Sequence, residues 1–195
     1  MERYKTFIKH VLGYLRCVFG RVKYPKKGKI YVGRNVHFVN GENIKLGHNI
    51  EIRPDVDLFA GAILKIGNGC DIGTRNRIVG NIIVEDNVLM GPDNYICSHD
   101  HCYEDIFVPI IKQGVHAIYN NGHEELKIGE GSWVGTHCAI IGDVHIGKHC
   151  VIGANSVVTK DIPDYCVAVG TPAQIIKRFN VETNKWQRVK CTEGK

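Results

Sequence analysis

Aliphatic side chains recur at every sixth position along most of the chain. The first run, interrupted by one slip of two residues, comprises Leu46, Ile52, Leu58, Ile66, Ile72, Ile78, Val84, Met90 and Ile96. The second run comprises Ile128, Val134, Ile140, Ile146, Ile152 and Val158, and a weaker start of the pattern appears at Val32 and Phe38. A period of six fits neither the helical period of about 3.6 residues nor the hairpin spacing of about 8 to 12 residues.

The residues between the aliphatic positions indicate how such a chain folds. The position after the aliphatic residue is often Gly, and the fourth position after it is small or β-branched, at Cys70, Val88, Ser132, Cys138, Val144, Cys150 and Ser156. We expect the chain to wind round a triangular prism, with one short strand per face, the aliphatic side chains inward and the small residues inside near the corners. Gly or Asn is expected at the turns, where a positive φ costs little. The pattern predicts a β-solenoid, since a β-sandwich would need this spacing to arise by coincidence.

Hexads such as "IGNGCD", "IGTRNR", "VGTHCA" and "IGANSV" resemble the repeat of the hexapeptide-repeat acyltransferases. That repeat has an aliphatic residue, then Gly, Ala, Glu or Asp, and a small residue three positions later. The resemblance implies an all-β fold, a left-handed parallel β-helix, and a homotrimer with active sites between subunits. The handedness comes from the resemblance alone, because the general crossover preference is right-handed.

The chain of 195 residues has room for one core with short appendages. We predict a helical segment at residues 1–28, a solenoid domain at 29–172 and a capping segment at 173–195. The repeat stops at Ile96 and resumes in register at Ile128, so residues 97–127 are expected to leave the prism as an ordered protruding loop. A loop of this length inside a compact domain is usually functional.

The start of this loop, "ICSHDHCYED", admits three interpretations. In the first, His99 is a general base that takes a proton from an acceptor as it attacks a thioester. In the second, zinc is bound by Cys97, His99, His101 and Cys102, although a second pair of metal-ligand residues is missing nearby. In the third, these are exposed polar residues of an ordinary loop and have no chemical role.

The resemblance favours the first interpretation. In the sugar O-acetyltransferases of the family, a His follows the last repeat residue before a long loop and acts as the catalytic base, and "CSHDH" puts His99 there, with His101 as the runner-up. Asp100 or Glu104 is a candidate to orient the imidazole, and the resemblance does not choose between them. It also implies no acyl-cysteine intermediate at a neighbouring cysteine.

The stretch from "GSWVGTHCAI" to "GTPAQIIKRF" resembles the galactoside, maltose and streptogramin acetyltransferases. Trp133 precedes a repeat residue and should face outward; the resemblance implies that it borders the acceptor and pantetheine channel. The backbone N–H of Thr136 would donate to the thioester oxyanion. The residues implied to bind acetyl-CoA are Ala154, Thr159, Lys160, Lys177 and Arg178, of which the cations suit phosphates.

Basic residues are concentrated at the N-terminus. Residues 1–29 hold nine Lys and Arg against one acid, while the remainder holds sixteen against nineteen. Residues 3–20 have apolar positions at helical spacing and predict an amphipathic helix. This helix either caps the first coil or lies on an anionic membrane. A nucleic-acid partner is not expected, because the solenoid lacks interleaved basic and aromatic residues.

Together these features predict a cytoplasmic acetyl-CoA-dependent O-acetyltransferase acting on a sugar or glycan hydroxyl in surface polysaccharide synthesis, with no metal. We expect any contact with the inner face of the membrane to be made through residues 1–28. N-acetylation of an amino sugar and xenobiotic acetylation stay open. A γ-type carbonic anhydrase is a remoter alternative, with zinc held by histidines drawn from His99, His116, His123 and His137. A non-enzymatic scaffold would leave Trp133 and the loop histidines unused.

Overall fold

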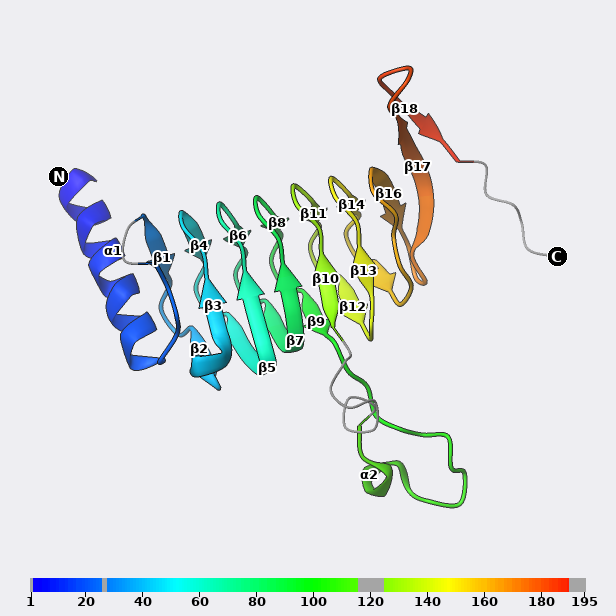
Figure 1. Ribbon diagram of the computed structural model, residues 1–195, viewed down its shortest axis with the longest axis horizontal. Coiled ribbons are helices and arrows are strands. Elements are labelled where there is room, and N and C mark those ends of the chain that lie inside the picture. The colour runs from blue at the N-terminus through cyan, green and yellow to red at the C-terminus, as the bar shows by residue number, and fades with distance from the viewer. Residues whose placement is uncertain (1, 26–27, 116–124, 190–195) are drawn as a thin grey trace.

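The computed structural model describes residues 2–25, 28–115 and 125–189, which form a three-sided parallel β-solenoid (Figure 1). The first face stacks β1 (Ile30–Val32), β4 (Ile50–Ile52), β6 (Asp71–Ile72), β8 (Leu89–Met90), β11 (Trp133–Val134), β14 (Val151–Ile152) and β16 (Cys166–Val169). The second face stacks β2 (His37–Val39), the first halves of β5 (Asp57–Ile66) and β7 (Arg77–Val84), then β9 (Tyr95–Cys97), β12 (Ala139–Ile141) and β15 (Val157–Val158). The third face stacks β3 (Ile44–Leu46), the second halves of β5 and β7, β10 (Leu126–Ile128) and β13 (His145–Ile146).

The period of six is confirmed as the length of one face. Ile72 pairs with Met90 in the next coil, and polar contacts repeat at a sequence separation of 18 residues, which is three hexads. Every residue of the two aliphatic runs is buried, and so is every small residue at the fourth position. The aliphatic ladders therefore form one continuous core inside the prism.

The turns confirm in part the prediction that Gly or Asn takes the positive φ. The left-handed conformation falls three positions after the aliphatic residue, at Asn49, Gly69, Asn87, Gly131 and Asn155 as predicted, but also at Arg75, Asp93 and His137. Where Gly directly follows the aliphatic residue, it is required for a different reason. A Cβ at Gly73 would lie 2.6 Å from the backbone of the next coil, so glycine is needed there for close approach and not for its dihedral freedom.

The slip of two residues in the first run is an irregularity in β5. Between Ala60 and Leu64 the strand has two more residues than its partner segment on β7. The side-chain Oδ1 of Asn81 accepts hydrogen bonds from the backbone N–H of Ala62 at 2.6 Å and of Ile63 at 3.3 Å. The extra backbone is thus paired, and the ladder resumes in register.

Non-solenoid elements lie at both ends and in the middle. The helix α1 (Glu2–Phe19) lies against the first coil, and an antiparallel hairpin of β17 (Gln174–Asn180) and β18 (Lys185–Arg188) follows the last coil (Figure 1). A 3₁₀ turn, η1 (Gly41–Asn43), lies between β2 and β3. A protrusion carrying α2 (Ile110–Gln113) hangs from the solenoid between β9 and β10 (Figure 1). In the described part of the chain, no helix is both long and apolar enough to cross a bilayer.

An ion pair holds the two coils on either side of the protrusion. Lys127 Nζ lies 2.8 Å from Glu85 Oε1, and the backbone N–H of Glu130 donates to Glu85 Oε2 at 3.0 Å. The hydrogen bond from Lys127 lowers the pKa of Glu85. This carboxylate therefore stabilises the fold at a pH above the ordinary glutamate pKa, and the stabilisation is lost as the pH falls through the lowered folded-state value.

We expect Glu85→Gln to lower the free energy of unfolding at pH 7 by under about 1 kcal/mol, because both partners are partly exposed. The difference from the unsubstituted protein should shrink as the pH falls through the lowered folded-state pKa of Glu85. Urea unfolding at pH 7 and at a series of lower pH values measures this. A difference that persists undiminished in acid, or one matched by Glu182→Gln on the exposed hairpin, would show that the pair is not its origin.

Candidate active site

The corner between the second and third faces carries several of the candidate residues. On the second face β9 pairs with β12, and β12 pairs with β15. His99 follows β9, while Thr159 and Lys160 follow β15. Because neighbouring strands are about 4.8 Å apart, the two groups are separated by roughly 10 Å along the solenoid axis. The fold therefore aligns the proposed base and two of the proposed CoA residues on one rigid edge.

His99 is half-buried at the root of the protrusion. Its Nδ1 lies 3.8 Å from the Sγ of Cys97, and that thiol lies 3.2 Å from the backbone oxygen of His99. Beneath the imidazole is Gly80, with a φ of 107°, where a Cβ would come within 3.0 Å of His99 Nδ1. The glycine leaves room for the ring, and Ser98 fixes the preceding backbone by donating its N–H to Val79 O at 3.1 Å.

Sequence reasoning missed Tyr95 as a member of this group. Tyr95 and Cys97 are two positions apart on β9, so both side chains point away from the prism interior. Hydrogen bonding to Cys97, followed by burial, raises the pKa of Tyr95. The thiol thus lies between a phenol and the His99 imidazole. The signal in the sequence would have been the alternation of side chains along β9, which puts Tyr95 on the same outward side as Cys97 next to the loop.

The other loop residues have different surroundings. His101 is exposed and forms an isolated antiparallel bridge with Val115, which closes the root of the protrusion. The carboxylate of Asp100 accepts the backbone N–H of His101 at 2.8 Å, and that of Glu104 accepts the N–H of Tyr103 at 2.9 Å. Both acids therefore have roles in loop structure, and the choice of an acid to orient His99 stays a prediction.

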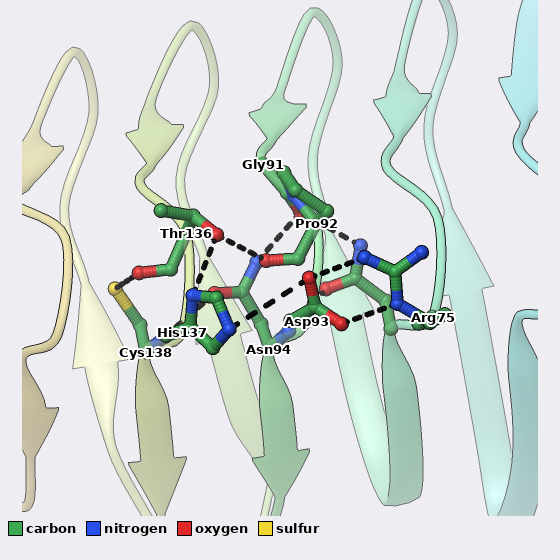
Figure 2. Close-up of polar contacts among 9 residues, drawn as sticks. Arg75, Gly91, Pro92, Asp93, Asn94, Thr136, His137 and Cys138 are labelled. Atoms are coloured by element: carbon green, nitrogen blue, oxygen red, sulfur yellow. Dashed lines mark hydrogen bonds and ion pairs between the residues drawn. The ribbon is translucent and has the colours of Figure 1, made fainter.

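Thr136 lies on a different corner, between the first and second faces (Figure 2). Its hydroxyl donates to the backbone oxygen of Pro92 at 2.9 Å, and the hydroxyl oxygen lies 3.0 Å from Nδ1 of His137. Since the hydroxyl proton is directed at Pro92, the His137 Nδ1–H is the donor of the second bond. The backbone oxygen of Thr136 accepts from Asn155 in the next coil at 2.9 Å.

A charged ladder continues from Thr136 along this corner (Figure 2). Arg75 binds the Asp93 carboxylate through two contacts of 2.6 and 2.7 Å, and His137 Nε2 lies 3.8 Å from the same carboxylate. The hydrogen bond from Arg75 holds the pKa of Asp93 below its usual range. The signal in the sequence is the recurrence of polar residues three positions after the aliphatic one.

Trp133 is half exposed on the first face, as its position before a repeat residue predicts. It pairs with Val151, which pairs with Val167, which pairs with Lys177 on β17. These side chains form one outward row, because residues opposite each other in a sheet share a face. Arg178 is the next residue on β17 and points to the other side. The structure therefore places Lys177, but not Arg178, in the row of Trp133.

The candidate residues thus form two groups on either side of the second face. Ala154 is stacked on the coil of Thr136, since a Cβ at Gly135 would lie 2.7 Å from Ala154 N. Trp133, Thr136, Ala154 and Lys177 form the first group. The second group consists of His99, Thr159 and Lys160, at the corner between the second and third faces. Between them, the outward side of the second face is largely apolar, at Val79, Tyr95, Ala139, Ile141 and Val157.

Within residues 2–25, 28–115 and 125–189, no group of three or more His, Cys, Asp and Glu side chains has the arrangement of a metal site. His99 and His137, two candidates for a carbonic anhydrase site, lie on different corners of the same chain. His116 and His123 fall outside the described residues. Cys97 and Cys102 are not joined in a disulfide, and both are buried.

Comparison with known proteins confirms the resemblance. Residues 126–160 match the family model of the bacterial transferase hexapeptide, described as six repeats. A Mycobacterium tuberculosis protein named "Probable acetyltransferase" is 32% identical over 166 residues, covering 73% of this chain and 52% of that protein. Galactoside O-acetyltransferase of Escherichia coli is 32% identical over 140 residues, covering 69% and 64%. An E. coli protein named "Putative lipopolysaccharide biosynthesis O-acetyl transferase WbbJ" is 26% identical over 162 residues, covering 80% of this chain and 79% of that protein.

Solved structures show the same fold. A maltose O-acetyltransferase from Clostridium difficile is 29% identical and has a TM-score of 0.56, covering 85% of this chain and 75% of that one. AntD, an N-acyltransferase from Bacillus cereus, gives a TM-score of 0.68 at 18% identity, over 87% and 90% of the two chains. The chain belongs to the hexapeptide-repeat family of bacterial transferases. It spans 52% and 64% of the first two relatives named above.

Proposed function

We propose that this protein is an O-acetyltransferase that moves an acetyl group from acetyl-CoA to a sugar hydroxyl. The observation that carries the proposal is the edge between the second and third faces, where a half-buried imidazole and a lysine lie on one rigid scaffold about two coils apart. The names of the relatives, which include a galactoside and a maltose O-acetyltransferase, support this acceptor class. The likeness to WbbJ supports a role in surface polysaccharide synthesis.

The proposed chemistry is direct transfer within a ternary complex. A ring nitrogen of His99 takes the proton of the acceptor hydroxyl while its oxygen attacks the thioester carbonyl carbon. The backbone N–H of Thr136 donates to the oxyanion that forms. Collapse of this intermediate breaks the carbon–sulfur bond, and the leaving CoA thiolate recovers the proton from the imidazolium. No acyl-enzyme is needed, so Cys97 has no covalent role in the scheme.

We place the complete site between two copies of the chain in a homotrimer. In one copy, the His99 group and the Thr136 group are on different corners, separated by the largely apolar second face. The protrusion also carries exposed apolar side chains, at Tyr103, Ile106, Phe107, Ile110 and Ile111. Burial of these surfaces against a neighbouring copy would favour assembly, and the assembly would bring the His99 group of one copy to the Trp133 and Thr136 group of the next.

The proposal is tested by measuring CoA release from acetyl-CoA with a panel of free sugars, nucleotide sugars and lipid-linked glycans. Turnover with a hydroxyl acceptor is the expected result. Turnover restricted to amino sugars would replace it with N-acetylation, and a protein that neither binds CoA nor turns over any acceptor would refute it.

Removal of one cation at the proposed CoA site should weaken donor binding. We expect Lys160→Ala to raise the KM for acetyl-CoA about tenfold, because a charged hydrogen bond to a phosphate is lost. The matched control is Lys45→Ala, which removes another exposed lysine, on β3 near the opposite end of the solenoid. Steady-state kinetics at saturating acceptor measure both. Equal KM values for the two variants would remove Lys160 from the CoA site.

A further inference from the structure

The helix α1 covers the first coil with its polar and small residues. His10 Nδ1 lies 2.8 Å from the backbone oxygen of Ile30, and the Tyr14 hydroxyl donates to Gly28 O at 2.6 Å. Gly13 approaches so closely that a Cβ there would lie 3.0 Å from Ile30 O. Cys17, a residue of the helix, is fully buried and belongs to the core. Capping of the solenoid end therefore uses this side of α1, and it satisfies backbone groups of the edge strand β1.

The opposite side of α1 is apolar and uncovered. Its exposed side chains are Ile8, Val11, Leu12, Leu15, Val18 and Phe19, and the exposed fraction rises from 39% at Ile8 to 84% at Phe19. Their spacing of three and four residues puts them in one stripe along the helix. A helix whose only function was to cap the coil would turn this stripe inward. We call these six residues the α1 stripe.

The α1 stripe continues into a groove on the solenoid. Phe19 lines it together with Phe38, Val39 and Phe59, and the groove has a volume of about 600 Å³. Arg16 and His37 lie at its polar parts. The uncovered apolar surface thus extends from the helix onto the second face of the first coils, which makes it larger than a single helix face.

The segment that carries the α1 stripe is strongly basic. Residues 1–29 hold nine of the 25 Lys and Arg in the chain and one of the 20 acids. Exposed members in the described part of this segment include Lys9, Arg21, Lys23 and Lys29. A negatively charged surface would be attracted to this end, whereas the remainder of the chain is slightly acidic. Apolar insertion and attraction to anionic lipids are the two signals that together hold an interfacial helix on a bilayer.

We propose that the α1 stripe binds the surface of an anionic lipid bilayer while the opposite side of the same helix caps the solenoid. The sequence left open whether the helix caps the first coil or lies on a membrane. In this proposal it does both, with different faces. The proposal does not depend on the acetyl-transfer activity. It identifies the bilayer as the occupant of the stripe because the surrounding charge is of one sign, which disfavours apposition of a second, equally charged copy of the same segment.

Co-sedimentation of the full chain with vesicles tests the proposal. One set of vesicles is phosphatidylcholine with about a quarter phosphatidylglycerol, and the other is phosphatidylcholine alone. The protein should sediment with the anionic vesicles and stay largely in solution with the neutral ones. Leu15→Asp should lower the partition coefficient for anionic vesicles at least about tenfold, since an apolar anchor becomes an acid. Val181→Asp, the same change in charge at an exposed site on the far hairpin, should leave it unchanged.

Three results would overturn the proposal: equal partitioning of both variants, equal binding to the two kinds of vesicle, or no binding at all. Mass measurement by light scattering without vesicles addresses a second copy as the occupant. A Leu15→Asp protein of lower oligomeric mass would show that the stripe is a contact between copies and would also overturn the proposal. Circular dichroism melting checks that Leu15→Asp folds. We expect an unchanged melting temperature, because Leu15 is on the side of α1 that faces away from the first coil.

Discussion

Replacement of His99 by Ala is expected to lower kcat by roughly two to four orders of magnitude, which is the usual contribution of a positioned general base. The KM for acetyl-CoA should change little, because the imidazole acts on the acceptor proton and not on the donor. Turnover with saturating acetyl-CoA and acceptor measures the effect.

His101→Ala is the matched control, with the same residue type two positions along the loop. His101 is exposed and bridges to Val115 at the root of the protrusion, so its loss should cost less than about tenfold. A loss of less than tenfold in His99→Ala itself would rule out its assignment as the base. If the large loss appeared in His101→Ala instead, the base would be moved to that residue.

The second large effect concerns stability. We expect Asn94→Ala to lower the free energy of unfolding by about 2 to 4 kcal/mol, because it leaves a buried N–H without a partner. Asn94 is buried at a corner, where its Oδ1 accepts the backbone N–H of Cys138 at 2.8 Å and its Nδ2 donates to Gly91 O at 2.8 Å. Its own N–H donates to Asn76 Oδ1 at 3.0 Å. Asn94 therefore connects three consecutive coils, through its backbone N–H to the coil of Asn76 and through its side chain to the coil of Cys138, across the insertion of the protrusion.

Asn68→Ala is the control for this prediction. Asn68 makes similar contacts between coils, with its Oδ1 accepting from His48 N at 2.8 Å and its Nδ2 donating to Asp86 at 3.0 Å, but it is exposed. Water can replace those bonds, so the loss should stay under about 1 kcal/mol. Urea unfolding of both variants decides the matter. Equal losses would mean that burial of the Asn94 partners is not what makes the contact valuable.

The two histidine candidates show how far the sequence reached at the site. The interruption of the hexad repeat after Ile96 identified His99 as the candidate base, because the end of a regular repeat can be read directly from the sequence. It did not reveal Tyr95, whose link to the site passes through Cys97 and depends on the outward side of β9. The sequence also grouped Lys177 with Arg178, and only the register of β17 on β16 separates them.

The sequence by itself determined the coil. A hexad repeat specifies which side chains point inward, and each coil can bury its ladder only by stacking on the next, so the solenoid and its core follow from local pattern. The tertiary structure decided what depends on position around the prism. It put the His99 and Thr136 groups on different corners, and it turned the α1 stripe outward. These facts depend on twist, register and docking of segments far apart in the chain, which a six-residue period does not encode.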